Sequence, residues 1–433
     1  MSTDRTAGLD RVLPERFEQL ADARTPDYLE AAIERASSRG QRPAWTFPER
    51  WLPMELVSAR APTSPLPWRR LGLLALLVVL LVAMVAVYVG SRPRLPAPFG
   101  RAANGLIAFD AEGDIYSLDP MTGQTAALVT GPAFDARPIF SRDGTRFAFA
   151  RAGEGRNALL FVANADGTNM IQVTPEPLDE FGPYHDAWSF SPDGRTILAT
   201  ALVDNTFSML LIPTDGSGAI RTIDVGMSVE APSFRPPNGS EILFVGHRAE
   251  DGITGLYAVD PTTSVVRTIV EPTTGVGAGS WSPDGSRILY GSMDAKDVWR
   301  THLISADGTA DVRVDHDPGT ASEGEAVWSN DGTRLIITRV FSPGGLDHRA
   351  AVIPVDGVAP KVEIQCPSVR SAALGDLCAR WVWAPDDASI FGVYFDAKER
   401  AAQRLTVDPL TGETVAAPWP GDNGQPAWQR LAP

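Results

Sequence analysis

The sequence predicts an all-β fold, a seven-bladed β-propeller, behind one transmembrane helix and a short helical N-terminal tail. A unit of about 47 residues recurs through residues 104–433, which is the period of four-stranded propeller blades. An uncharged apolar run covers Leu71–Gly90. The last residues of the chain contain the aromatic strand that the first unit lacks, so we expect the C-terminus to close the first blade.

Residues 1–68 are predicted to form a cytoplasmic tail with two short helices and a linker rich in proline and aromatic residues. Three apolar residues share one face of the first helix at i, i+4 and i+7: Leu13, Phe17 and Leu20. The second helix begins at Thr25, a good N-cap residue, with Pro26 at its first position. In residues 42–54 prolines alternate with aromatic residues and prevent a regular helix. This stretch is either a docking segment or a spacer.

The run Leu71–Gly90 is predicted to be a transmembrane helix. Its twenty residues carry no charge. At about 1.5 Å of rise per residue they span a hydrocarbon core of about 30 Å. A buried core helix is the alternative, but such helices rarely run this far without a polar side chain. Seventy residues precede the run and no small-residue cleavage site follows it, which argues against a cleaved signal peptide.

Charge leaves the orientation of this helix undecided. Three arginines precede the run and three follow it closely: Arg60, Arg69, Arg70, Arg92, Arg94 and Arg101. We place the N-terminus in the cytoplasm, because the tail has no export signal and a large domain behind a signal-anchor is normally translocated. The expected location is the cell membrane, single-pass, with residues 91–103 as a linker and the propeller outside the cytoplasm.

The repeat has two landmarks. The first is an aromatic residue followed by a Ser-Pro-Asp-Gly-like turn and an alternating apolar strand. Its copies are FSRDGTRFAFA at Phe140, FSPDGRTILAT at Phe190, FRPPNGSEILFV at Phe234, WSPDGSRILYG at Trp281, WSNDGTRLIIT at Trp328 and WAPDDASIFGV at Trp383. Asp-Gly or Asn-Gly supplies the positive φ angles of a tight hairpin turn. The third copy has an extra residue and the last has Asp387 in place of Gly, so we expect those two turns to be less regular.

The second landmark is another turn centred on an aspartate. It occurs seven times, at Asp119, Asp166, Asp215, Asp260, Asp307, Asp356 and Asp408. Two hairpins per unit give four strands per unit. The first unit starts midway, and Trp428 supplies the missing aromatic landmark 45 residues after Trp383. A strand around Trp428 should therefore be the innermost strand of a blade whose other strands come from residues 105–130.

The aromatic-Ser-Pro-Asp-Gly unit resembles the TolB-type, WD-repeat-like propeller repeat of bacterial envelope proteins. The resemblance covers about three quarters of the chain. It implies binding of a protein or peptide at the propeller faces or channel, and it brings no catalytic motif. The layout of tail, span and exported domain also resembles that of membrane anti-sigma factors, which implies a cytoplasmic partner such as a sigma factor. The tail has no His and no Cys, so it lacks the zinc signature of those factors.

The net charge of −15 and the pI near 4.8 exclude nucleic acid as an expected partner, since phosphate binding needs a basic surface. No two of the five histidines lie close enough in sequence for a local metal motif, and there is no Gly-x-Ser-x-Gly elbow. We therefore predict no catalytic, cofactor-binding or metal residues, no cofactor and no enzyme. The turn aspartates, such as Asp193 and Asp284, are interpreted as structural. Gly275-Val-Gly-Ala-Gly is interpreted as a loop before a blade strand.

Some alternatives stay open. His185 with Asp186, and His316 between two aspartates, lie in expected loops and are the remaining site candidates. Cys366 and Cys378 form a disulfide if the region is exported, or stay as two thiols. Three functions are consistent with the sequence: a binding or sensing module, which we favour, a passive envelope scaffold, and a propeller enzyme. The ligand and the oligomeric state are not predicted.

Overall fold

The computed structural model describes residue 34 and residues 68–90, 99–153, 157–178, 188–247, 253–314, 322–341, 348–357, 361–365, 379–396, 401–417 and 426–432. The chain forms two compact units, Met1–Arg92 and Pro93–Pro433, and each is described by itself. The predicted tail helices, the candidates His185 and His316, and the pair Cys366 and Cys378 lie outside the described residues.

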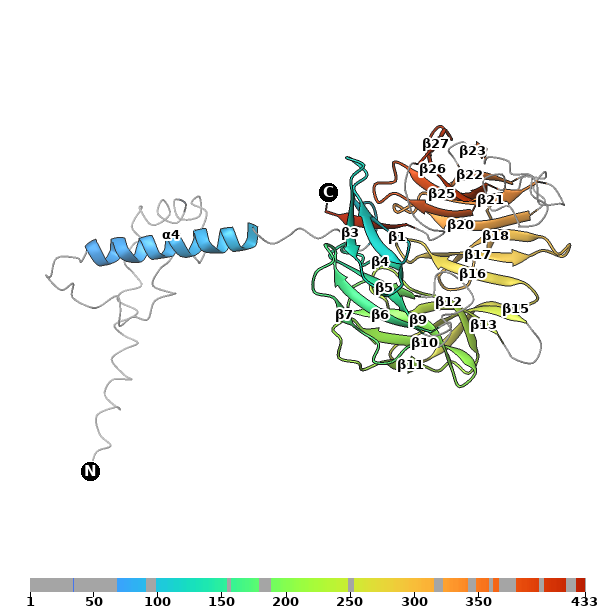
Figure 1. The fold of residues 1–433 in the computed structure, drawn as a ribbon, viewed down its shortest axis with the longest axis horizontal. Helices are drawn as coiled ribbons and strands as arrows, with labels where there is room; N and C mark the ends of the chain where they lie inside the picture. Colours follow the sequence, from blue (N-terminus) through green and yellow to red (C-terminus); the bar gives the residue numbers. More distant parts are fainter. Residues whose placement is uncertain are drawn as a thin grey trace, which may run out of the picture. The chain divides into compact units, whose positions relative to one another are not determined.

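The first unit contains helix α4, Trp68–Gly90, which begins three residues before the predicted apolar run (Figure 1). Between Leu73 and Val82 its large apolar side chains are more than half exposed. Counting only residues whose placement is described, no helical segment meets the length and hydropathy criteria of a membrane span. The transmembrane assignment stays a prediction.

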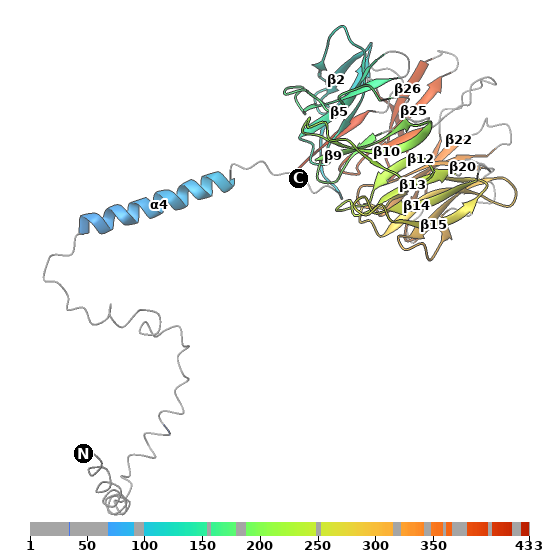
Figure 2. The same ribbon diagram turned by 90° about the horizontal axis from the view of Figure 1, so that it is seen from below.

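The second unit is a seven-bladed propeller, as the sequence predicts, and each blade is a four-stranded antiparallel sheet (Figures 1 and 2). From the innermost strand outward, blades 1 to 3 are β28 (Ala427–Leu431), β1 (Ala103–Ala111), β2 (Asp114–Leu118) and β3 (Thr125–Val129); β4 (Asp135–Phe140), β5 (Arg146–Ala152), β6 (Ala158–Asn164) and β7 (Ile171–Gln172); and β8 (Trp188–Phe190), β9 (Thr196–Val203), β10 (Thr206–Pro213) and β11 (Arg221–Ile223). Blades 4 and 5 are β12 (Ser228–Phe234), β13 (Ile242–His247), β14 (Thr254–Val259) and β15 (Val266–Thr273); and β16 (Val276–Trp281), β17 (Arg287–Met293), β18 (Trp299–Ser305) and β19 (Val312–Arg313). Blades 6 and 7 are β20 (Ser322–Trp328), β21 (Arg334–Val340), β22 (His348–Pro354) and β23 (Val362–Gln365); and β24 (Ala379–Trp383), β25 (Ile390–Asp396), β26 (Ala401–Val407) and β27 (Thr414–Ala416).

Blade 1 joins the two ends of the propeller. Strand β28 pairs antiparallel with β1, with Trp428 opposite Ile107 and Arg430 opposite Asn104. The indole N–H of Trp428 donates to the carbonyl of Gly105 at 3.2 Å, and its ring packs edge-on against Phe391 of blade 7 at 4.4 Å between centroids. The predicted closure by the C-terminal strand is confirmed, and it pairs an edge that would otherwise be open.

The turns after the innermost strands of blades 2, 3, 5, 6 and 7 follow one pattern. In blade 2 the N–H of Gly144 donates to the carbonyl of Ser141 at 2.9 Å, and Asp143 Oδ1 accepts from Ser141 Oγ at 2.6 Å and from the N–H of Thr145 at 3.1 Å. The glycine has the positive φ that the Asp-Gly pair was expected to supply, 67° in Gly144. The aspartate acts as a hydrogen-bond acceptor that fixes the turn.

Two turns were expected to be irregular. In blade 4 the N–H of Gly239 donates to the carbonyl of Arg235 at 2.8 Å, four residues earlier instead of three. The loop also contains a cis Pro236–Pro237 bond. The prediction of an irregular turn in blade 4 is confirmed. In blade 7 the N–H of Asp387 donates to the carbonyl of Ala384 at 2.9 Å, as glycine does elsewhere, with φ 59°. That turn keeps the common geometry, because Asp387 adopts the left-handed conformation itself, and the prediction of irregularity is wrong there.

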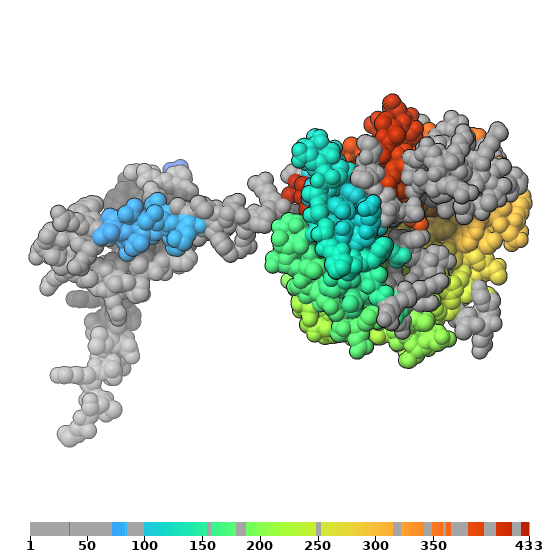
Figure 3. All heavy atoms as spheres, viewed as in Figure 1, coloured from blue at the N-terminus to red at the C-terminus, as the bar shows by residue number. Residues whose placement is uncertain are grey.

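The hydrophobic core lies between successive blades, which follow one another around the propeller in chain order (Figure 3). The second strands of the blades are buried on both faces; Phe147 and Phe149 of β5, Leu198 of β9 and Phe244 of β13 are all 0% exposed. One cluster joins blades 2 and 3 and another joins blades 6 and 7. Strands covered on both faces are apolar without alternation, so the prediction of an alternating apolar strand after each turn is wrong.

Candidate functional site

Five of the seven innermost strands share a bulge beside the space they enclose. In β4, β12, β16, β20 and β24 the pairing with the second strand shifts by one residue, two to four positions before the aromatic landmark. Arg137, Ala231 and Arg380, each three positions before its aromatic residue, have φ values of 57°, 46° and 66°. A bulge bends its strand and redirects the side chains beside it, and bulges are common next to functional sites.

A cavity of about 710 Å³ lies among these strands, and we call it the axial cavity. Its walls come from the innermost strands of blades 3 to 7 together with β17 and β18. Gly277, Ala278 and Gly279 of β16 leave it open, because none of them carries a side chain larger than methyl. The Gly275-Val-Gly-Ala-Gly segment is therefore a cavity-lining strand from Val276 onward, and its interpretation as a loop is wrong.

Aromatic side chains form much of the remaining wall. Trp299 is 37% exposed beside Gly277. The other aromatic residues of the lining are Trp188, Tyr290, Trp328 and Trp381. The hydroxyl of Tyr290 donates to Asp311 Oδ2 at 2.8 Å, and burial together with this carboxylate raises the pKa of Tyr290 above its usual range. The Trp381 indole N–H donates to Thr338 Oγ1 at 2.8 Å. These bonds fix the rings that face the cavity.

The charged groups of the cavity wall are bonded to one another or to the backbone. Glu323 is 4% exposed, and its carboxylate accepts from the N–H of Thr301 at 2.6 Å and from Arg313 at 2.9 Å, with Arg300 at 3.7 Å. The carboxylate of Glu325 accepts a hydrogen bond from the backbone N–H of Arg380. These contacts tie blades 5, 6 and 7 together around the cavity.

A second, smaller space of about 150 Å³ adjoins the axial cavity, and we call it the inner chamber. Ser233 and Ser280 line both spaces. Its other walls include Arg142 and Asn330 from the turns that follow innermost strands, Arg430 from β28, and Phe99. The inner chamber therefore lies at the end of the axis where these turns gather.

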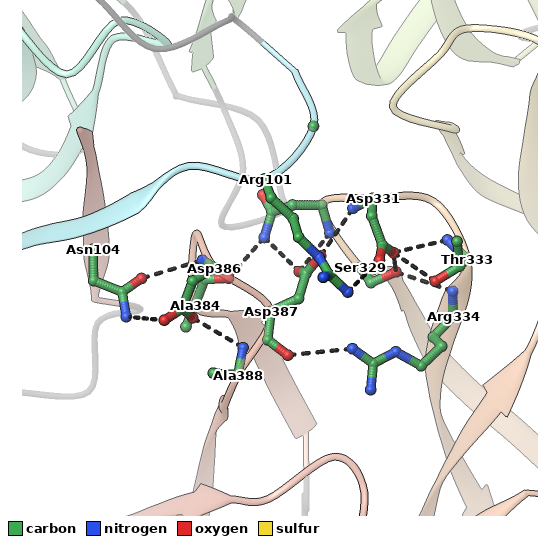
Figure 4. A network of polar contacts seen from close by, with 12 residues as sticks. Arg101, Asn104, Ser329, Asp331, Thr333, Arg334, Ala384, Asp386, Asp387 and Ala388 are labelled. Atoms are coloured by element: carbon green, nitrogen blue, oxygen red, sulfur yellow. Dashed lines mark hydrogen bonds and ion pairs between the residues drawn. The ribbon is translucent and has the colours of Figure 1, made fainter. Parts of the chain in front are cut away.

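The same turns carry a network of polar contacts where the ring closes (Figure 4). The buried carboxylate of Asp387 accepts from the backbone N–H groups of Asn330 and Asp331 at 2.7 and 2.9 Å, and from Arg101 Nε at 3.3 Å. Asn104 Nδ2 donates to Asp386 Oδ2 at 2.8 Å. The network joins blades 6 and 7 to the segment that leads into β1.

The turn aspartates have the structural role that the sequence predicts. Asp193 Oδ1 accepts from Ser191 Oγ at 2.6 Å, and Asp284 Oδ1 from Ser282 Oγ at 2.6 Å. Among the residues that the structure describes, no group of three His, Cys, Asp or Glu side chains is arranged to hold a metal ion. The resemblance implied a binding channel, but the residues that line the axial cavity were not predicted. The cavity's one sequence signal is the run of small residues before Trp281, which stands out from the larger residues before the other aromatic landmarks.

The chain matches no family model and no curated protein. Its fold is similar to that of solved structures. An oligogalacturonate lyase in complex with manganese is 17% identical over 73% of this chain and 85% of that chain, with a TM-score of 0.55. The β-propeller domain of the Trilobed protease from Pyrococcus furiosus is 14% identical over 73% and 97%, with a TM-score of 0.51. TolB from Acinetobacter baumannii is a more distant match, 17% identical over 75% and 81%, with a TM-score of 0.45.

At these identities the likeness shows a shared propeller fold and no shared activity. The protease propeller is described as having an open velcro topology, whereas β28 and β1 of this chain form a closed first blade.

Proposed function

We propose that this protein is a membrane-anchored binding module, and that its propeller holds a protein, peptide or other envelope ligand in the axial cavity. One observation carries the proposal. The cavity of about 710 Å³ has aromatic rings and exposed glycine backbone on its walls and lies within the size range of ligand pockets. Aromatic rings supply contact area, and strand backbone free of side chains offers hydrogen bonds to an extended ligand.

The polar groups of the wall support binding over catalysis. The carboxylate of Glu323 is already bonded to the N–H of Thr301 and to Arg313, so it holds two blades together. A general acid or base needs a group that is free to exchange a proton with substrate. A passive scaffold is the alternative function, and it would leave the cavity empty.

We further propose that α4 anchors the chain in the cell membrane with the propeller outside the cytoplasm, and that the tail passes a signal to a cytoplasmic partner. The apolar side chains of α4 between Leu73 and Val82 support the anchor. A pull-down with residues 1–68, compared with Phe17→Ala and Leu20→Ala, tests the tail. The proposal predicts that the wild-type tail recovers one partner in a stoichiometric amount and that both variants lose it. Recovery of nothing specific removes the signalling part.

The cavity assignment can be tested by filling the cavity. In Ala278→Trp the new ring would occupy the space beside Gly277, and the equivalent position of blade 6 already carries a long side chain, Glu325, so the strand should fold. The full chain in detergent is incubated with a pool of tetrapeptides, and the retained peptides are identified by mass spectrometry after ultrafiltration.

The wild type should retain a subset of the pool, and Ala278→Trp should retain about tenfold less. The matched control is Ala126→Trp, at an exposed position on the outermost strand of blade 1. Equal retention by the wild type and Ala278→Trp would place the ligand elsewhere.

A further inference from the structure

Two guanidinium groups converge on the inner chamber. Arg430 donates to Asn330 Oδ1 at 2.9 Å and to the carbonyl of Gly100 at 2.6 Å. Arg142 stacks on the ring of Phe99 at 4.8 Å, and among the described residues no carboxylate pairs with it. Both side chains line the inner chamber, and Arg142 is also exposed to solvent. Two like charges held this close are stabilised by an anion between them.

The chamber also holds polar groups without a partner. In blades 6 and 7 the indole N–H groups of Trp328 and Trp383 donate to the carbonyls of Ser280 and Val327 at 3.4 and 3.3 Å. The indole N–H of Trp281 is buried, with the residue 7% exposed, and has no acceptor among the described residues. The buried hydroxyl of Ser233 has none either. A buried donor left unsatisfied costs about 1–3 kcal/mol, so such groups normally mark a missing ligand or water.

The two guanidinium groups and the two unpaired donors indicate the chemical class of the ligand. A carboxylate or phosphate accepts from several donors at once and carries the charge that two arginines balance. Water could satisfy the indole and the hydroxyl, and Asp387 already offsets part of the charge of Arg430, but an anion would also pair with Arg142. A space of about 150 Å³ has room for a single such group.

We propose that the inner chamber is an oxyanion site that binds the terminal carboxylate of a ligand whose remainder lies in the axial cavity. Ser233 and Ser280 line both spaces, so the two spaces adjoin, and the proposed ligand extends from one into the other. The inference rests on the proposed function and adds the class of ligand, a peptide with a free C-terminus. It also gives a route for sensing, because a ligand in the chamber contacts Phe99, which precedes β1 in the chain.

The other blades supply conservative test variants. Proline occupies the position equivalent to Arg142 in three turns, at Pro192, Pro283 and Pro385, so Arg142→Pro removes the guanidinium with a residue that this turn accepts. Phenylalanine occupies the position equivalent to Trp281 in blades 2 to 4, so Trp281→Phe removes only the N–H donor and some ring area. Arg195→Gln is the matched control, since Arg195 is an exposed arginine of the blade 3 turn.

The experiment uses the full chain in detergent and two tetrapeptide pools of identical sequence, one with free and one with amidated C-termini. Calorimetric titration with inorganic phosphate at constant ionic strength forms a second arm. The wild type should retain free-acid peptides at least about tenfold better than amides. Arg142→Pro and Trp281→Phe should reduce this preference, while Arg195→Gln should not.

Failure of the oxyanion site and failure of the proposed function give different results. If both pools are retained equally and Arg142→Pro changes nothing, while Ala278→Trp abolishes retention, the oxyanion site is overturned and the axial cavity stands. If no peptide is retained but phosphate binds the wild type and not Arg142→Pro, the chamber stands and the peptide ligand is wrong. If neither peptides nor phosphate bind, both proposals fail.

Discussion

The carboxylate of Asp387 accepts a hydrogen bond of 2.7 Å from the backbone N–H of Asn330, which joins the turn of blade 7 to the turn of blade 6. Asp387 occupies the position that glycine holds in the other turns and has φ 59°. A non-glycine residue is strained in that region of φ. Its contacts with the neighbouring turn give a physical reason for an aspartate here.

Replacing this aspartate by the glycine of the other turns should destabilise the propeller. Asp387→Gly relieves the backbone strain but leaves the N–H groups of Asn330 and Asp331 without their acceptor. We expect a net loss of about 2 kcal/mol in the free energy of unfolding, measured in urea. Asp387→Asn keeps one oxygen acceptor and should lose less. An Asp387→Gly variant as stable as the wild type would show that the network does not stabilise the ring.

A second prediction concerns the packing of Trp381. A Cβ at Gly392 would lie 2.3 Å from the Trp381 ring, which is 2% exposed and held by Thr338. Gly392→Ala should therefore destabilise by about 2 kcal/mol, because the ring cannot move without losing its bond. At Gly291 the nearest atom to a new Cβ is 3.5 Å away, so Gly291→Ala serves as the control. Equal melting temperatures for the two variants would contradict the packing.

The turn aspartates predict a loss of stability in acid. Burial raises the pKa of Asp193, but hydrogen bonds from Ser191 and Arg195 outweigh it, and the net shift is downward; Asp284 shows the same balance. A carboxyl whose pKa is depressed in the folded state stabilises the fold above its unfolded pKa. That contribution is lost as the pH falls below about 3.8.

Urea unfolding between pH 5 and pH 3 measures this loss. Asp193→Asn keeps an acceptor but cannot titrate, so its stability relative to the wild type should improve as the pH falls. A difference that stays constant with pH would mean that Asp193 does not contribute to the acid sensitivity.

The proposed topology makes a separate prediction. A phosphatase reporter that is active only outside the cytoplasm should work when fused after residue 433 and should fail when fused within residues 1–60. The reverse result would invert the chain and would remove the reason to expect a disulfide between Cys366 and Cys378. If the topology holds, mass spectrometry of unreduced protein should find the two cysteines joined.

The propeller could be predicted because its signal is repeated and local. Each aromatic landmark and each turn aspartate marks a hairpin, and Trp428 gives the phase that assigns β28 to blade 1. The left-handed conformation of Asp387 was not predicted, because a single sequence does not show that its carboxylate accepts hydrogen bonds from the turn of a neighbouring blade.

The candidate site could not be predicted in the same way. Gly277 and Gly279 read as loop residues because glycine is rare in strands, and only the bulged innermost strand beside an open axis explains them. Arg142 and Arg430 lie far apart in sequence and meet only because the ring closes. Sites assembled across a closed ring leave no local motif.

The inner chamber depends on this closure, because Arg430 lies on β28, and the axial cavity that adjoins it is lined by blades 3 to 7 of the same ring. The most direct measurement compares the thermal unfolding of residues 93–433 with that of residues 93–420, which lack β28. The account predicts a single cooperative transition for the longer chain, and aggregation or a much lower melting temperature for the shorter one. Equal melting temperatures would contradict the closed seven-bladed ring and the site built on its axis.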